Sequence, residues 1–214
     1  MKNLKIIGML ILLVSFMACK KDKVTPEPAE EPFDITEYVL VEKGLGLEDE
    51  DHIITTFELQ GKATWYTLIG ALTGPTYTYD NGVLKIYLAG TLEREFKIED
   101  RKIVSYSPKA KLYTCQLVKT SKSNQLNGNT YAGGWKTEGS NLTFIASLKF
   151  NDTHYSEASI NLPEPNTTYK TIKNVGAFSS IDFVNTIWIT IDGKLEGSRK
   201  PANGNVSIGT FTKK

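Results

Sequence analysis

The sequence contains few of the residues that carry most protein chemistry. It has two cysteines and two histidines among 214 residues. So few cysteines exclude a disulfide-rich scaffold, and so few histidines restrict metal binding and acid–base catalysis. The motifs HExxH, GxSxG and paired CxxC are missing, as are the glycine patterns of nucleotide-binding loops. We therefore expect no catalytic residue, no metal site and no cofactor.

The sequence also lacks an excess of one charge and a long apolar run. The 25 lysines and arginines nearly balance the 24 acidic residues, which gives a formal net charge of +1. Because there is no basic excess, we expect no nucleic-acid partner. The apolar run at residues 6–17 is about a dozen residues long, whereas a membrane-spanning helix needs about 20. This run is therefore too short to span a bilayer.

The first 18 residues are typical of a secretory signal peptide. Lys2 and Lys5 precede the apolar run, and the small residue Ala18 ends it. A positive start, a short apolar centre and a small residue at the end are the features that a signal peptidase recognises. We predict that residues 1–18 are absent from the mature protein.

Cys19 follows the signal peptide directly. The stretch "FMAC", residues 16–19, resembles a bacterial lipobox, with Phe16 where leucine is usual. The resemblance implies that Cys19 is acylated and anchors the chain to a lipid bilayer. Acyl chains contribute about 0.8 kcal/mol for each buried methylene, so three chains would make release negligible. The alternative is an ordinary signal peptide followed by an incidental cysteine.

The residues after Cys19 predict a tether. The stretch "CKKD", residues 19–22, resembles the start of Bacteroidetes-type lipoproteins, which implies an outer-membrane location on the periplasmic or the cell-surface face. Residues 19–33 are rich in proline and glutamate and have little to bury, so we predict that they are disordered. At about 3.1 Å per residue, the tether would hold the folded part up to roughly 40 Å from the bilayer.

Apolar and polar residues alternate along much of the remaining sequence, which is typical of half-buried β-strands. The alternating stretches are residues 84–88, 95–99, 142–150, 187–191 and 206–210. Hairpin turns are indicated by Asp80-Asn81-Gly82, Glu99-Asp100-Arg101, Asp192-Gly193 and Asn203-Gly204. We predict an all-β, antiparallel fold of about sixteen short strands.

A polar segment without alternation, residues 119–125, divides these strands into two groups. A weak internal echo favours the same division, because "LQG" precedes Trp65 and "LNG" precedes Trp135. We predict two small β-barrel or β-sandwich modules, at residues 34–122 and 123–214.

Three stretches of the second module carry a family resemblance. They are "LNGNTYAGGW", "LTFIASLKFND" and "GTFTKK", all within residues 126–214. They resemble the small lipocalin-like (calycin-like) domains of Bacteroidetes-type lipoproteins. The resemblance implies a β-barrel, and barrels of this kind commonly hold one small apolar ligand.

Arg94 is the polar residue that we single out as a ligand-binding candidate. It is in phase with Leu92, Phe96 and Ile98, on the face that the alternation assigns to the core. A buried guanidinium must be paired or must face a wet cavity. We predict that Arg94 is interior and paired with an acid or a bound anion. An interior salt bridge without a ligand and a slipped strand register are the alternatives.

Aromatic side chains could stack on a ligand such as a sugar ring. Most of them should belong to the core. Tyr77, Tyr79 and Trp188 are the three that we predict as ligand contacts, because each lies on a strand where aromatic residues are close together or next to an apolar face.

The other reactive residues favour structural roles. Asp152 and His154 are predicted at a strand end and turn and not in a metal site. The acids at residues 48–51 are consecutive, so their side chains point in different directions and favour a solvated loop over a calcium site. Cys115 alternates with apolar neighbours, which predicts a buried, inert thiol.

Together these features predict a lipid-anchored cell-envelope protein that binds a small ligand or a glycan and is not an enzyme. Its partners would be the lipid bilayer, through acylated Cys19, and a small ligand, glycan or envelope protein. The alternative is a structural or assembly role as an accessory lipoprotein that acts through protein–protein contacts. A closed apolar pocket of about 300 Å³ or more would favour the ligand-binding function.

Overall fold

The computed structural model describes residues 32–44, 52–108, 114–201 and 204–214. The predicted signal peptide, Cys19, most of the predicted tether and the acidic stretch 48–51 lie outside the described residues. The described residues form eighteen strands and two 3₁₀ helices, η1 (Ile35–Glu37) and η2 (Leu59–Gly61), and contain no α-helix. None of the helices in these ranges is long and apolar enough to cross a membrane.

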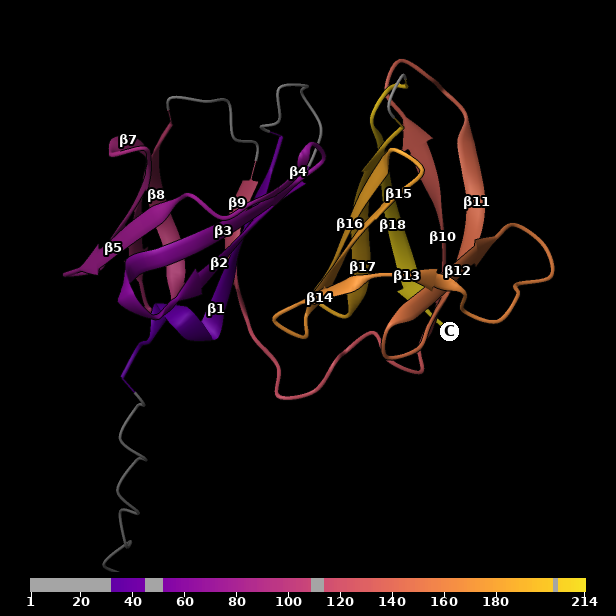
Figure 1. Ribbon diagram of the computed structural model, residues 1–214, viewed down its shortest axis with the longest axis horizontal. Helices are drawn as coiled ribbons and strands as arrows, with labels where there is room; N and C mark the ends of the chain where they lie inside the picture. The colour runs from indigo at the N-terminus through magenta and orange to yellow at the C-terminus, as the bar shows by residue number, and fades with distance from the viewer. Residues whose placement is uncertain (1–31, 45–51, 109–113, 202–203) are drawn as a thin grey trace, which may run out of the picture. The chain divides into compact units, whose positions relative to one another are not determined.

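The first half of the chain forms one antiparallel sheet, which we call sheet 1. Its strands are β1 (Tyr38–Lys43), β2 (His52–Glu58), β3 (Lys62–Thr67), β4 (Gly70–Leu72), β5 (Thr76–Asp80), β6 (Val83–Leu88), β7 (Thr91–Glu99), β8 (Lys102–Pro108) and β9 (Thr114–Lys119). The order is β8-β7-β6-β5-β3-β2-β1-β9, with β4 beside β3. The edge strands β8 and β9 contact each other, so the sheet curls into a nearly closed barrel (Figure 1).

The second half forms another antiparallel sheet, sheet 2. Its strands are β10 (Thr130–Thr137), β11 (Thr143–Phe150), β12 (His154–Ala158), β13 (Thr167–Thr168), β14 (Lys170–Ile172), β15 (Gly176–Ile181), β16 (Val184–Ile191), β17 (Lys194–Lys200) and β18 (Ser207–Lys213). The order is β13-β12-β11-β10-β18-β17-β16-β15-β14. Only Tyr169 separates the edge strands β13 and β14 along the chain, so this sheet is also a nearly closed barrel. The predicted all-β fold of two antiparallel modules is confirmed, with eighteen described strands instead of sixteen.

Tight turns place the strands as the sequence predicts. Asn81 and Gly82 have φ angles of 50° and 77° between β5 and β6, and Asp192 and Gly193 have 49° and 76° between β16 and β17. Positive φ at both central residues defines the hairpin turn whose twist matches that of the strands, and Asn-Gly and Asp-Gly adopt it most readily.

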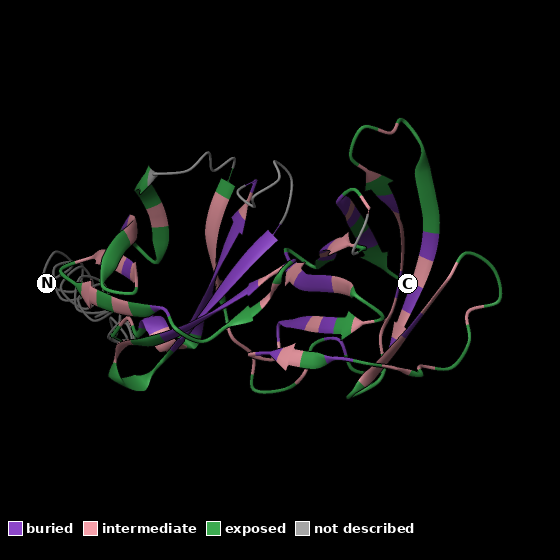
Figure 2. Cartoon of the chain, turned by 45° about the horizontal axis from the view of Figure 1, so that its top comes forward, coloured by how far each residue is buried: buried purple, intermediate pink, exposed green. Residues whose placement is uncertain are grey.

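Two apolar clusters lie on the opposite faces of sheet 2. The cluster inside the barrel contains Leu126, Tyr131, Trp135, Ala146, Leu148, Phe150, Tyr169, Ala177, Trp188, Leu195 and Phe211. The other cluster, which we call the junction core, joins the outer faces of both sheets and contains Val39, Val41, Ile54, Tyr66, Leu68, Ile172, Val175, Ile187, Ile189, Ile191 and Val206. Figure 2 shows the resulting bands of buried residues along the strands of each sheet. The two sheets therefore share buried apolar surface.

Candidate functional site

Arg94 lies on the interior face of sheet 1 and is ion-paired there. Its Nη1 atom donates a hydrogen bond to Oε2 of Glu42 at 3.1 Å, and its guanidinium carbon lies 4.7 Å from the centre of the Trp65 ring. The Arg94 side chain is 14% exposed, and the Glu42 side chain is completely buried. The prediction that Arg94 is interior and paired with an acid is confirmed; a role in ligand binding stays a prediction.

The prediction that Leu92 lies on the same face of β7 as Arg94 is wrong. Arg94 pairs with Ile86 but Leu92 pairs with Tyr87, so β7 has one extra residue at this point. Such a bulge reverses the direction of the side chains beyond it. Leu92 is accordingly 37% exposed, while Phe96 and Ile98 share the interior face with Arg94.

Burial controls the chemistry around this pair. Removal from water raises the pKa of Glu42 to about 7, and the nearby Arg94 charge opposes this shift. Cys115 lies directly across from Glu42 on β9. Burial, together with the Glu42 charge, raises the pKa of its thiol to about 11. Cys115 therefore stays protonated near neutral pH and is a poor nucleophile.

Of the other predicted ligand contacts, Tyr77 and Tyr79 share the interior face of sheet 1 with Arg94, because Tyr77 pairs with Ile86, which pairs with Arg94. Tyr77 and Tyr79 are half-buried on β5, and the Tyr77 hydroxyl donates to the Glu58 carbonyl at 2.9 Å. Trp188 lies in sheet 2, where it is fully buried. Its ring lies 4.5 Å from that of Tyr155, so it belongs to the core inside the barrel.

A second interior arginine, which the sequence analysis missed, lies in sheet 2. Arg199 on β17 donates from Nη1 to Oε1 of Glu157 at 2.9 Å, and its guanidinium carbon lies 4.5 Å from the centre of the Trp135 ring. The Trp135 Nε1 atom donates to the same Glu157 oxygen at 2.8 Å. Arg199 is in phase with Leu195 and Gly197, so the rule that singled out Arg94 could also have found it.

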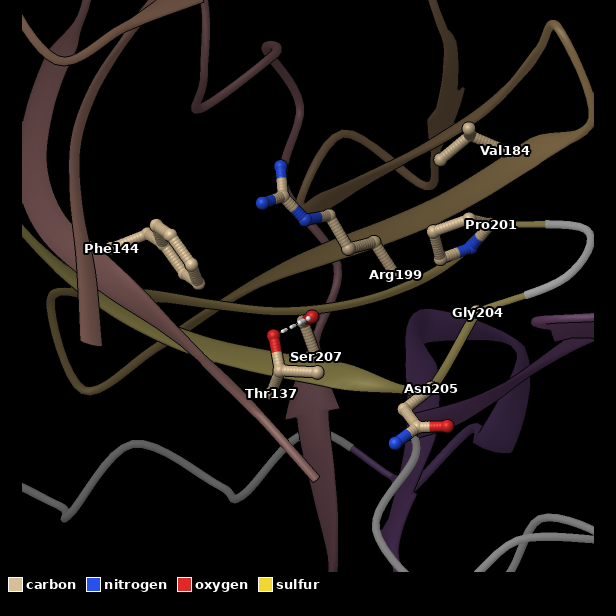
Figure 3. A pocket seen from close by; sticks show the side chains of 8 residues that line it. All are labelled: Thr137, Phe144, Val184, Arg199, Pro201, Gly204, Asn205 and Ser207. Atoms are coloured by element: carbon tan, nitrogen blue, oxygen red, sulfur yellow. Dashed lines mark hydrogen bonds between the residues drawn. The ribbon is translucent and has the colours of Figure 1, made fainter. Parts of the chain in front are cut away.

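A hollow of about 450 Å³ opens at the mouth of sheet 2, and we call it the mouth hollow. Its lining residues are Thr137, Phe144, Val184, Arg199, Pro201, Gly204, Asn205 and Ser207. In Figure 3 the Arg199 side chain extends between Phe144 on one side and Val184 and Pro201 on the other. The hydroxyls of Thr137 and Ser207 are 2.8 Å apart and share a hydrogen bond at the base.

The mouth hollow combines an apolar wall with one cation. Glu157 engages Nη1 of Arg199, but a guanidinium carries five N–H donors. Arg199 can therefore donate to acceptor oxygens of a ligand while it keeps its ion pair. A carboxylate fits this donor geometry, because its two oxygens can accept two parallel N–H···O hydrogen bonds.

The remaining reactive residues stand apart from this site. The His154 Nδ1 atom and the Thr153 hydroxyl are 2.8 Å apart at the start of β12. Within the described ranges, no three histidine, cysteine, aspartate or glutamate side chains gather as metal ligands would.

Comparison of the chain with protein-family models, curated proteins and solved structures finds no match.

Proposed function

We propose that this protein is a lipid-anchored cell-envelope protein that binds a small ligand in the mouth hollow of sheet 2 and has no enzymatic activity. The mouth hollow is the observation that carries the proposal. Its volume of about 450 Å³ falls within the range typical of small-molecule sites, about 300–1,000 Å³, but it is open to solvent and is not the closed pocket that the sequence analysis set as the criterion. The resemblance of this half of the chain to lipocalin-like domains favours the same function.

The lining selects a ligand with an apolar body and an anionic end. Phe144, Val184 and Pro201 offer apolar surface, whereas Arg199 supplies the positive charge. A fatty acid of medium length has this chemistry. Its chain would lie against the apolar wall, and its carboxylate would accept hydrogen bonds from Arg199.

Binding of decanoate to the full chain, measured by isothermal titration calorimetry, tests the proposal. Decanol has the same chain without the charge, so we expect it to bind about tenfold more weakly, the loss of one charge-assisted hydrogen bond. Val184→Trp should abolish binding because the indole fills the mouth hollow. Val104→Trp is the matched control, since Val104 is 50% exposed on β8 of sheet 1 and should leave binding unchanged.

Failure of decanoate to bind, or equal binding by both tryptophan variants, would refute the mouth hollow as the site. That result would favour the second candidate, an accessory lipoprotein that acts through protein contacts. Its support is the exposure of large apolar side chains in sheet 2, where Ile145 is 74% and Phe183 84% exposed.

The anchor is a separate part of the proposal and has its own test. We expect that palmitate fed to the host labels the wild type and does not label Cys19→Ser, because Cys19 is the residue to which the lipid would attach. Immunoprecipitation of both forms after labelling measures this. Equal labelling of the two forms would contradict lipid attachment at Cys19.

A further inference from the structure

The first residues of β11 have a neighbouring strand on one side only. β10 pairs with β11 from Thr143 to Lys149, whereas β12 pairs only with Ser147–Phe150. Residues 143–146 therefore form a free strand edge in the part of the chain that the structure describes, and we call it the β11 edge. Figure 1 shows β11 extending past the end of β12, and Figure 2 shows the start of β11 as exposed.

The backbone groups of Thr143 and Ile145 point outward at this edge. Residues in an antiparallel pair direct their N–H and C=O alternately toward one neighbour and then toward the other. The Phe150 backbone exchanges hydrogen bonds with the two residues that precede β10, at 3.1 and 3.0 Å. Counting back from Phe150 in steps of two, Phe144 also faces β10, so the residues on either side of it face away. No described residue forms a hydrogen bond with the outward N–H and C=O groups of these two residues.

The β11 edge lacks the features that protect strand edges. Lysine, proline or a bulge usually prevents a free edge from pairing with another chain. The sheet 1 edge strand β8 has Lys102 and Pro108 at its ends. The β11 edge has neither residue, its register with β10 is regular, and Leu142, Phe144 and Ile145 are each more than half exposed. An edge of this kind is a ready template for one more strand.

A second copy of the chain can supply that strand. The two outward residues lie symmetrically about Phe144, and residues 142–147 carry no charge. Two such edges in antiparallel orientation satisfy all their outward groups at once and bring no like charges together. A peptide from another protein would leave a new free edge on its own far side. The pattern of this edge therefore favours pairing with itself.

We propose that this protein forms a homodimer in which two β11 edges pair as antiparallel strands about a twofold axis at Phe144. Thr143 of each copy then exchanges two hydrogen bonds with Ile145 of the other, and the two Phe144 side chains lie directly opposite each other. The added strand begins at Thr143, so it stops short of the position that Ala158 occupies beside Ser147. Phe144 also lines the mouth hollow, but the pairing uses backbone groups and needs no ligand, so the two proposals fail or succeed separately.

Cysteine crosslinking tests the register. The Cα atoms of the two facing Phe144 residues would be about 4.5 Å apart, within the disulfide range of about 4.4–6.8 Å. Phe144→Cys should therefore form a covalent dimer under mild oxidation. The two Ile145 residues would be diagonal neighbours about 7–8 Å apart, so Ile145→Cys should crosslink at least about tenfold more slowly, although it is the more exposed position. The wild type, which keeps Cys19 and Cys115, is the control for the other thiols.

Sedimentation equilibrium of the full chain tests the dimer itself. Strands this short make a smaller interface than a stable complex uses, so we expect the average mass to rise with concentration across about 5–200 µM. Ile145→Lys places a charge at the edge and should raise the dissociation constant at least about tenfold. Ile69→Lys is the matched control in sheet 1, since both isoleucines are about three-quarters exposed, and it should leave the dimer unchanged.

Both lysine positions are exposed, so both variants should fold. A wild type that stays monomeric over this concentration range would overturn the proposal and would leave the β11 edge free for a peptide strand of another protein. Equal weakening by both lysine variants, or crosslinking of Ile145→Cys as fast as that of Phe144→Cys, would also overturn it.

Discussion

Each barrel contains an arginine on its interior face, and each arginine has the same two kinds of partner. Arg94 pairs with Glu42 and stacks on Trp65. An interior charge without a partner would cost several kcal/mol, while a carboxylate and an indole face both offset it. The second arginine, Arg199, is more exposed than the first, since it is 28% exposed against 14%. The carboxylate partners differ in the same direction, since Glu42 is fully buried and Glu157 is 25% exposed.

Stability should depend on pH through Glu42. Its pKa is about 7 in the folded protein and 4.5 ordinarily, so between these values the folded state binds more protons than the unfolded state. The wild type should therefore lose about 3 kcal/mol of unfolding free energy as the pH rises from about 4.5 to above 7. Glu42→Gln cannot titrate and should lack this loss.

Urea unfolding of both proteins at about pH 5 and about pH 8 measures the difference. Glu95→Gln removes a half-exposed carboxylate that pairs with Lys85 on the same sheet, so it controls for the loss of a negative charge. If wild type and Glu42→Gln change in parallel between the two pH values, Glu42 does not titrate in this range.

The sequence could predict part of the residue-scale picture. The alternation of apolar and polar residues placed Arg94 on the interior face of its strand, and it would have placed Arg199 on the interior face as well. Strand phase could not identify Glu42 or Glu157 as their partners, because each partner lies on a strand distant in the chain. Tyr77, Tyr79 and Trp188 were chosen by residue type and strand neighbours, which do not show whether an aromatic side chain lines a cavity or packs in a core.

At the scale of strands, alternation and turn residues were sufficient to predict most elements. Residues 84–88 and 187–191 alternate and fall within β6 and β16. The bulge in β7 has no such signal, because it depends on how that strand pairs with β6. The sequence also did not distinguish a β-barrel from a β-sandwich. Closure depends on the return of β9 to β1 and of β18 to β10, which are contacts between the ends of each half.

The two sheets are joined by the junction core, which the alternation pattern did not reveal. Val39 and Val41 face this core, while Leu40 between them is also buried. A run that is apolar on both faces shows burial but not the identity of the covering surface. The predicted division into domains at residues 34–122 and 123–214 stays a prediction. Each predicted segment contains one complete sheet, and residues 120–129 connect the two.

Loss of packing in the junction core should affect the whole folded unit. Ile189→Ala removes a fully buried side chain from this core and should lower the unfolding free energy by about 2–5 kcal/mol. Hydrogen exchange should accelerate in β1 and β2 as well as in β16, since the core stabilises both sheets. Ile160→Ala is the control, because Ile160 is 78% exposed. Acceleration confined to sheet 2 would show that the sheets unfold separately.

The two arginine sets differ in the order of their members along the chain. In the first half the order along the sequence is glutamate, tryptophan, arginine, from Glu42 to Arg94. In the second half tryptophan comes first, and Trp135 is followed by Glu157 and Arg199. A tandem gene duplication preserves the order of its parts. An in-order tandem alignment of the two halves would therefore not superpose these two sets.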